Sequence, residues 1–128
     1  MPKQVLQPKS LPVPKPAYSP GIRKGNLVFT AGMIPQDDQG TLVGEGDIAA
    51  QTEQCLKNMQ AVLAEAGATL DDVVKCTIFL SDISNGKAMN EVYKKFFPHD
   101  KPGRTTVQAA LARPQMLVEI EAIAVLDD

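Results

Sequence analysis

The segment that follows residue 116 most strongly constrains the fold, because apolar and charged side chains alternate along it with a period of two. Glu119 and Glu121 occupy odd positions among bulky apolar residues, whereas every even position is apolar. This period is typical of a β-strand, whose successive side chains point to opposite faces of a sheet. The even face is expected in the core: Val118, Ile120, Ala122, Ala124 and Leu126. The mixed odd face indicates a second covered surface, for which another subunit is a candidate.

A second strand is predicted for residues 104–109, shortly before the first. Arg104, Thr106 and Gln108 share its polar face. Residues 110–115 form a connection short enough for a hairpin, so we expect the two strands to pair antiparallel. The polar face would then lie beside Glu119.

Arg104 is the leading candidate for ligand recognition, because a guanidinium group matches a carboxylate through two parallel hydrogen bonds. Each charge-assisted bond contributes about 1.5–3 kcal/mol. A structural salt bridge from Arg104 to Glu119 or Glu121 is an equally open interpretation. Glu119 can act as an acid/base group only if it is held away from that arginine, and apolar neighbours would then raise its pKa.

The rest of the chain predicts strands at residues 22–24, 27–33 and 73–80 and helices at 48–66 and 85–97. Helices that follow strands at this spacing indicate crossovers packed on one face of a single mixed sheet. Prolines at positions 8, 12, 14, 16 and 20 favour an extended N-terminal arm.

Length, charge and N-terminal composition exclude several classes of protein. The 128 residues suit one domain over residues 1–128, and a formal net charge of -2 gives no overall attraction to nucleic acid. The proline-broken start predicts neither a signal peptide nor a membrane span. Cys55 and Cys76 fall on apolar positions, where we expect buried, unreactive thiols, and the expected compartment is the reducing cytoplasm.

The sequence lacks the residues and motifs that several kinds of catalytic site require. His99 is the only histidine, and the two cysteines are too far apart in sequence for a zinc motif, so we expect no metal site. The chain has no phosphate-binding glycine loop, dinucleotide fingerprint or nucleophile elbow. The functions that remain are catalysis without a cofactor and ligand binding without catalysis.

Two further positions carry open interpretations. Tyr18 either pins the N-terminal arm to the body or lines a cleft. Gly32 either lets another group approach the backbone closely or marks the end of a strand before Pro35.

Motifs along nearly the whole chain resemble the RidA/YjgF/YER057c/UK114 family. The C-terminal signature is carried by residues 102–107 (PGRTTV) and 118–125 (VEIEAIAV). Further matches are residues 16–21 (PAYSPG), 29–35 (FTAGMIP), the helix at 51–67, and 90–97 (NEVYKKFF).

This resemblance implies a chorismate-mutase-like α+β fold, with a mixed sheet of about six strands and two helices on one face. It also implies a homotrimer with a ligand cleft at each subunit boundary. The family's type activity is the cofactor-free hydrolysis of reactive 2-imino acids, such as 2-iminobutanoate and 2-iminopropanoate, or their enamine tautomers, to 2-oxo acids and ammonia.

Matched by position, Arg104 corresponds to the family arginine that binds the substrate carboxylate, and Glu119 to the glutamate that assists water attack and proton transfer. Glu121 shares the face of Glu119, and only the resemblance prefers Glu119. Tyr18 corresponds to the cleft tyrosine, and Gly32 to the glycine whose backbone lies near the ligand.

Three positions depart from the better-known deaminases of this family. Ala31 replaces a frequent serine, Thr106 a frequent cysteine, and Gly86 a frequent phenylalanine. Ala31 and Thr106 are still expected to line the substrate site, in a roomier pocket. The alternatives are therefore a deaminase for a larger enamine such as 2-aminomuconate, or a non-catalytic metabolite-binding or chaperone-like trimer. Endoribonuclease activity is disfavoured by the acidic balance and the lack of a histidine pair.

Overall fold

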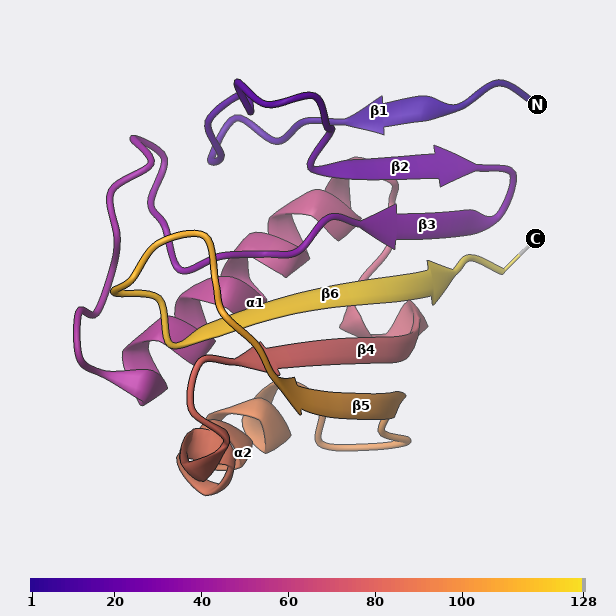
Figure 1. Ribbon diagram of the computed structural model, residues 1–128. Coiled ribbons are helices and arrows are strands. Elements are labelled where there is room, and N and C mark those ends of the chain that lie inside the picture. The colour runs from indigo at the N-terminus through magenta and orange to yellow at the C-terminus, as the bar shows by residue number, and fades with distance from the viewer. Residues whose placement is uncertain (128) are drawn as a thin grey trace.

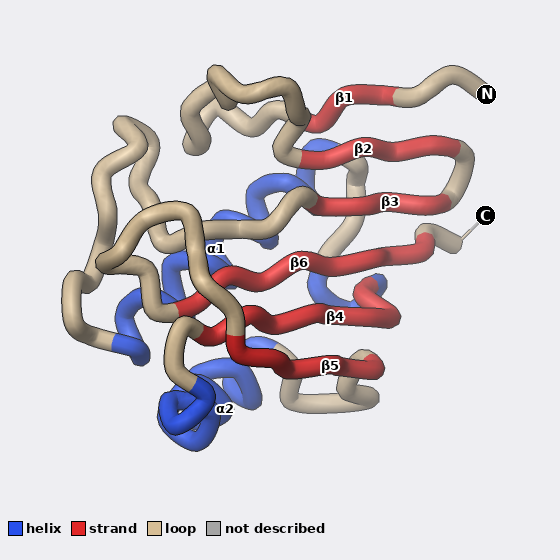
Figure 2. Tube along the Cα trace, viewed as in Figure 1, coloured by secondary structure: helices blue, strands red, loops and turns tan. Residues whose placement is uncertain are grey.

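The computed structural model describes residues 1–127 and contains one mixed β-sheet and two α-helices. The elements are β1 (Gln4–Leu6), β2 (Gly21–Lys24), β3 (Leu27–Thr30), α1 (Ile48–Glu65), β4 (Val73–Leu80), α2 (Gly86–Phe96), β5 (Gly103–Gln108) and β6 (Val118–Val125). Short 3-10 turns, η1 (Leu70–Asp72) and η2 (Ile83–Asn85), precede β4 and α2. Both helices lie on the same face of the sheet (Figure 1, Figure 2). The predicted α+β architecture is confirmed.

The strand order is β1-β2-β3-β6-β4-β5, and it corrects one expectation. β6 pairs antiparallel with β3 and β4, whereas β5 pairs parallel with β4. The predicted β5–β6 hairpin is therefore wrong, because β4 lies between the two strands. Burial gives the physical reason: β6 has a fully apolar face that needs helix cover, whereas no side chain of β5 is fully buried. The more polar strand therefore occupies the edge of the sheet.

Helix α1 forms as its sequence pattern predicts. Asp47 caps its N-terminus, where Oδ1 accepts a hydrogen bond from the N–H of Ala50 at 3.1 Å. Gly67 follows the helix with φ +74°, a conformation that glycine adopts without strain. The apolar stripe packs against β6 and β3 and is completely buried: Cys55, Leu56, Met59, Val62 and Leu63.

Both cysteines are buried and free, as predicted. Burial raises the pKa of the Cys55 and Cys76 thiols, so both remain uncharged at neutral pH.

The N-terminal region contains a strand that the sequence did not predict. β1 pairs with β2 where we expected only an extended arm. Leu6, the last residue of β1, is completely buried. The predicted strand at residues 27–33 is shorter, because β3 ends at Thr30. Met33 then forms an isolated antiparallel bridge with Ile120.

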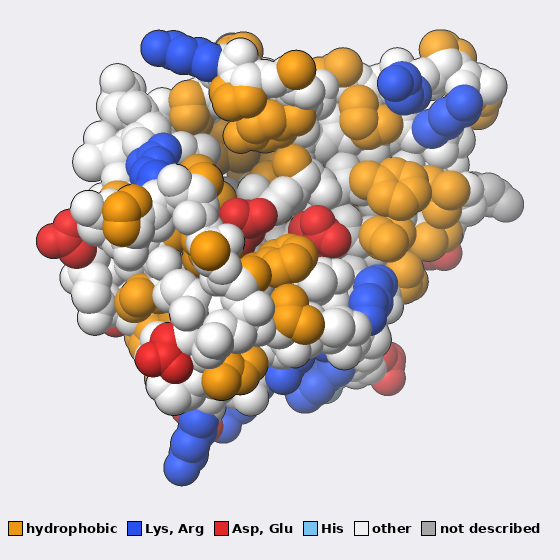
Figure 3. Space-filling model, viewed as in Figure 1, with side chains coloured by type: hydrophobic (Ala, Val, Ile, Leu, Met, Phe, Trp, Pro, Cys, Tyr) orange, Lys and Arg blue, Asp and Glu red, His pale blue; other side chains and the backbone are white. Residues whose placement is uncertain are grey.

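The face of the sheet opposite the helices carries both acidic and apolar side chains. Leu27 and Phe29 on β3 are each 41% exposed there, and Val107 on β5 is 40% exposed. Acidic side chains lie near the middle of this open face, among apolar surfaces (Figure 3). Glu119 and Glu121 belong to it, as their positions in β6 require. Within residues 1–127, neither helix combines the length and the apolar character that a membrane span requires.

Candidate functional site

Glu119 is held at the open face by the short connection after β3. Met33 donates its N–H to the carbonyl of Ile120 at 2.7 Å, and Ile120 donates to the carbonyl of Met33 at 3.0 Å. This pair of bonds places Gly32 directly against the side chain of Glu119. A Cβ atom at position 32 would overlap the Glu119 carboxylate, so only glycine leaves room for it here. The close approach expected at Gly32 is made by this carboxylate.

The environment of Glu119 favours the protonated carboxyl group. The side chain is half-buried, and loss of hydration raises its pKa above the ordinary glutamate value. The negative charge of Glu121, on the same face of β6, raises the pKa further. No Lys or Arg within residues 1–127 forms a salt bridge with Glu119, so nothing in the protomer offsets these effects.

A cleft of about 650 Å³ opens beside Glu119. Tyr18 from the N-terminal arm, together with Ala31 and Gly32 from the connection after β3, lines the cleft with Glu119. Tyr18 is 53% exposed, so it borders the cleft and does not pin the arm as a buried anchor. Four of the predicted site residues therefore meet in one place.

Arg104 lies on the other face of the sheet. In the parallel pairing of β5 with β4, Arg104 is the partner of Cys76, whose side chain is buried on the helix side. Its guanidinium Nη1 donates to Oδ1 of Asn90 on α2 at 2.6 Å, and the group lies 4.9 Å from the centre of the Tyr93 ring. The expectation that Arg104 lies beside Glu119 is therefore wrong within one protomer.

Arg104 remains accessible and carries no structural ion pair. No carboxylate within residues 1–127 forms a salt bridge with it, which removes the alternative of a bond to Glu119 or Glu121. It lines a separate cavity of about 280 Å³ with Asn90, Tyr93 and Lys101. Asn90 and Tyr93 orient the guanidinium through a neutral acceptor and an aromatic ring, so its positive charge is not neutralised.

Two hydroxyl groups next to Arg104 lack hydrogen-bond partners. Thr106, on the same face of β5, and Tyr93 have buried hydroxyl oxygens that bond to no group within residues 1–127. A buried hydroxyl without a partner costs about 1–3 kcal/mol. Both oxygens are buried within the protomer, so they shape the surroundings of Arg104 but are not exposed to a group from outside it.

The predicted residues thus form two sets on opposite faces of the sheet. Tyr18, Ala31, Gly32 and Glu119 line the open-face cleft, whereas Arg104 and Thr106 face α2. A single protomer does not bring the two sets together.

Three residues escaped the sequence reading of the site. Tyr93 is a buried residue of α2, and Asn90, one turn earlier, lines the same cavity. Their proximity to Arg104 follows from the parallel β4–β5 pairing, which the sequence pattern does not encode. Arg113, in the loop between β5 and β6, also lines the open-face cleft.

The described residues contain no group of three or more His, Cys, Asp or Glu side chains arranged to hold a metal ion. The polar side chains that line the two cavities carry hydroxyl, amide, guanidinium, ammonium and carboxylate groups.

Comparisons with known proteins place the chain in a family. The family model described as "Endoribonuclease L-PSP" matches residues 9–126. A RutC family protein of Pyrococcus abyssi is 42% identical over 124 residues, which cover 97% of this chain and 98% of that protein. The 3-aminoacrylate deaminase RutC of Acinetobacter baylyi is 38% identical over the same shares of the two chains.

A solved structure agrees with these sequence matches. E. coli TdcF, crystallised with bound serine, superposes with a TM-score of 0.89 at 34% identity, covering 97% of this chain and 99% of its own. The likeness extends over the sheet, both helices and the loops that carry the candidate residues. The chain belongs to the RidA/YjgF family and has its chorismate-mutase-like fold.

Proposed function

We propose that this protein is a cofactor-free deaminase that hydrolyses reactive 2-imino acids, or their enamine tautomers, to 2-oxo acids and ammonia. The observation that carries the proposal is the Glu119 carboxylate, half-buried against Gly32 in an open cleft. The relative from Acinetobacter baylyi is a 3-aminoacrylate deaminase, and 3-aminoacrylate is an enamine with a carboxylate group. The bound serine of TdcF is likewise a small amino acid with a carboxylate.

The complete site would form between subunits of a homotrimer. Arg104 lies at the edge strand β5, and its face is opposite to that of Glu119, so only a neighbouring copy can bring the two groups together. The exposed apolar residues Leu27, Phe29 and Val107 on the open face support burial of that face against other copies.

In this arrangement Arg104 of one subunit binds the substrate carboxylate and fixes the C=N carbon near Glu119 of the next. The Glu119 carboxylate takes a proton from a water molecule, whose oxygen attacks that carbon. The proton then passes to nitrogen and completes the carbinolamine. The carbinolamine hydroxyl gives its proton, through Glu119, to the amino group, the C–N bond breaks, and ammonia leaves with the 2-oxo acid as the second product. Tyr18, Ala31, Gly32 and Thr106 line the space around the reacting group.

A trapping assay tests the proposal directly. Threonine and a dehydratase generate 2-iminobutanoate in situ, and semicarbazide traps the imine that has not been hydrolysed. We expect the wild type to reduce the imine-derived semicarbazone, and Arg104→Ala to lose at least about 100-fold in kcat/KM, as removal of two charge-assisted bonds predicts. Lys57→Ala, on the exposed side of α1, is the control. Semicarbazone formation that the wild type leaves unchanged would refute deamination of small imines.

Ammonia release from imines and enamines of different sizes distinguishes two alternatives. A deaminase for larger enamines would release ammonia only from bulkier substrates, a reading that the roomier positions Ala31 and Gly86 favour. A metabolite-binding trimer is favoured by the accessible guanidinium of Arg104, whose charge no carboxylate within residues 1–127 neutralises and which can bind an anion without Glu119. It would release no ammonia, although 2-oxo acids would still protect it against thermal unfolding.

A further inference from the structure

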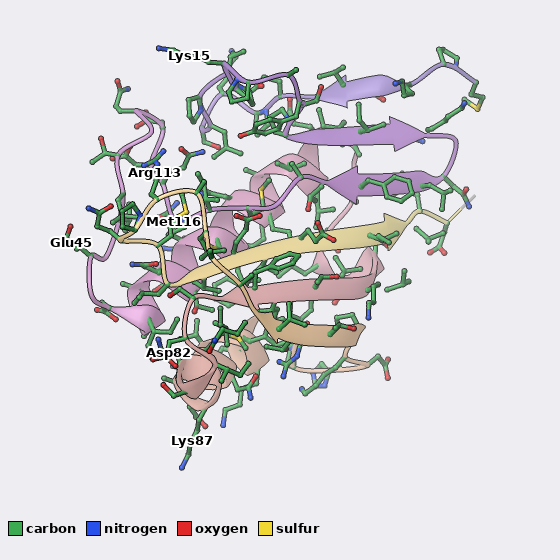
Figure 4. The ribbon with its side chains drawn as sticks, viewed as in Figure 1. Lys15, Glu45, Asp82, Lys87, Arg113 and Met116 are labelled. Carbon is green, nitrogen blue, oxygen red and sulfur yellow. The ribbon has the colours of Figure 1, made fainter. Side chains whose placement is uncertain are left out.

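Arg113 places a second guanidinium group at the open-face cleft. It belongs to the loop between β5 and β6 and extends toward the loop that follows β3 (Figure 4). Its Nη1 donates to the carbonyl of Gly40 at 3.0 Å, and its Nη2 donates to Oε1 of Gln36 at 3.4 Å. Both acceptors are uncharged, so these bonds orient the guanidinium and leave its charge in place.

The charge of Arg113 has no counterion in the described part of the chain. The residue is half-buried, and no carboxylate within residues 1–127 forms a salt bridge with it. The remaining N–H groups of the guanidinium are free to bind an acceptor in the cleft. Lys15 also borders the cleft, but its side chain extends outward from the arm (Figure 4). Arg113 is therefore the oriented cation of this cleft.

A buried methionine packs beside Arg113 in the wall of the cleft. Met116 lies one turn after Arg113, to whose carbonyl it donates its N–H at 3.1 Å, and it lines the same cleft. Its side chain is 1% exposed and lies next to Arg113 in Figure 4. Arg113 and the half-buried Glu119 carboxyl group thus line one cleft, which suits a ligand that carries an anionic group in addition to its reacting carbon.

The cleft is also larger than a four-carbon imino acid requires. Its volume of about 650 Å³ lies within the usual range for pockets that hold drug-sized ligands, roughly 300–1,000 Å³. The cleft that Gly32 and Glu119 border therefore has room for a ligand that also contacts Arg113.

We propose that Arg113 binds a second, distal carboxylate, so that the preferred ligands of this protein are dicarboxylic 2-imino or 2-oxo acids. This inference rests on the proposed function, in which Arg104 of a neighbouring subunit binds the carboxylate next to the reacting carbon. Arg113 then selects for the group at the other end of the molecule. The ligand class is a dicarboxylic 2-imino or 2-oxo acid, and an analogue without the second carboxylate lacks a partner for Arg113.

Binding of stable product-like acids tests the second carboxylate without turnover. Isothermal titration compares 2-oxoglutarate with 2-oxopentanoate, which has the same chain length and no distal charge. We expect the wild type to bind 2-oxoglutarate about tenfold more tightly, and Arg113→Gln to bring the ratio of the two affinities close to one. Arg113→Lys should restore part of the preference, because it keeps the charge and loses the planar geometry.

Lys57→Gln changes the net charge as Arg113→Gln does and should keep the wild-type ratio. Equal affinity of the wild type for both acids, or an equal loss for both in Arg113→Gln, would overturn the inference.

Turnover separates this inference from the proposed function. Imines are generated by amino-acid oxidases from glutamate and from norvaline, with catalase present, and ammonia release is followed. Hydrolysis of both imines with no preference would overturn the role of Arg113 and keep the deaminase. A 2-oxoglutarate preference that depends on Arg113, with ammonia released from both imines no faster than in the absence of the protein, would keep the subsite and refute the deaminase.

Discussion

The side chain of Glu119 occupies the space that a β-carbon on residue 32 would need. Gly32→Ala should therefore displace the carboxylate without unfolding the chain, because the displaced atoms are the far end of a flexible side chain. If Glu119 transfers the proton, kcat/KM should fall by about 100-fold, the lower end of the contribution of a positioned acid/base group. The melting temperature should change little.

Gly103→Ala is the matched control, since its nearest contact would be an ordinary one of 3.6 Å to the carbonyl of Val74. Full activity of Gly32→Ala in imine hydrolysis would contradict the role assigned to Glu119.

The raised pKa of Glu119 predicts a dependence of stability on pH. The folded protein binds this proton more tightly than the unfolded chain does, so stability falls as pH rises from the ordinary value of 4.5 through the folded-state pKa. Glu119→Gln removes this penalty. It should unfold at a higher temperature than the wild type at pH 7, and the difference should vanish at pH 4. A lower melting temperature of Glu119→Gln at pH 7 would contradict the assignment.

The hydrogen bond between Arg104 and Asn90 should set substrate affinity more than the rate of the chemical step. Asn90→Ala leaves the guanidinium supported only by the Tyr93 ring, and we expect KM to rise about tenfold with a smaller change in kcat. Asn90→Asp places a carboxylate on the arginine and should raise KM further, by competing with the substrate. Steady-state kinetics of both variants tests this order, and an improved KM in Asn90→Asp would be inconsistent with it.

The unexpected strand β1 should contribute measurably to stability. Leu6 is completely buried, so Leu6→Ala should lower the free energy of unfolding by about 2–4 kcal/mol, measured by urea denaturation. Val5, its neighbour on the opposite face of β1, is 58% exposed, and Val5→Ala should have little effect. Equal effects of the two substitutions would mean that β1 is not docked on β2.

The open face of the sheet should mediate the proposed assembly. Phe29→Glu places a charge on the apolar part of this face and should produce monomers in sedimentation experiments, with loss of activity. Ile83→Glu changes a side chain of similar exposure in the turn before α2 and should leave the assembly intact. A trimeric Phe29→Glu protein would locate the interface elsewhere.

The local sequence patterns predicted the elements well but not all of their neighbours. The alternation in β6 and the stripe of α1 each identify a buried face directly, because burial acts on every residue of that face. The partner of β5 is not visible in this way. Its side chains are almost all exposed, so its pattern contains no information on whether β4 or β6 lies beside it. β1 was missed because three residues between prolines give too short a period to detect.

The candidate site was predicted to the same extent: local motifs identified its residues but not the neighbours that strand order gives them. Gly32 and Glu119 meet because a single bridge between Met33 and Ile120 joins their segments. The N–H of Ala31 donates to the carbonyl of Pro20, which holds the arm that carries Tyr18 beside them, and the motifs already indicated all three positions. Arg104 was identified by its chemistry, but its surroundings depend on strand order. Arg113 lies outside the motifs, and its importance follows from its uncharged partners and its place in the cleft.

The opposite orientation of Arg104 and Glu119 has a genetic consequence. If each reaction centre combines the arginine of one copy with the glutamate of the next, a subunit in which one of these residues is replaced still supplies the other residue to an adjoining site. Two inactive proteins, Arg104→Ala and Glu119→Gln, should then regain activity when co-expressed, because mixed rings contain junctions that received an intact residue from each parent. Such intragenic complementation would not occur if every protomer worked alone.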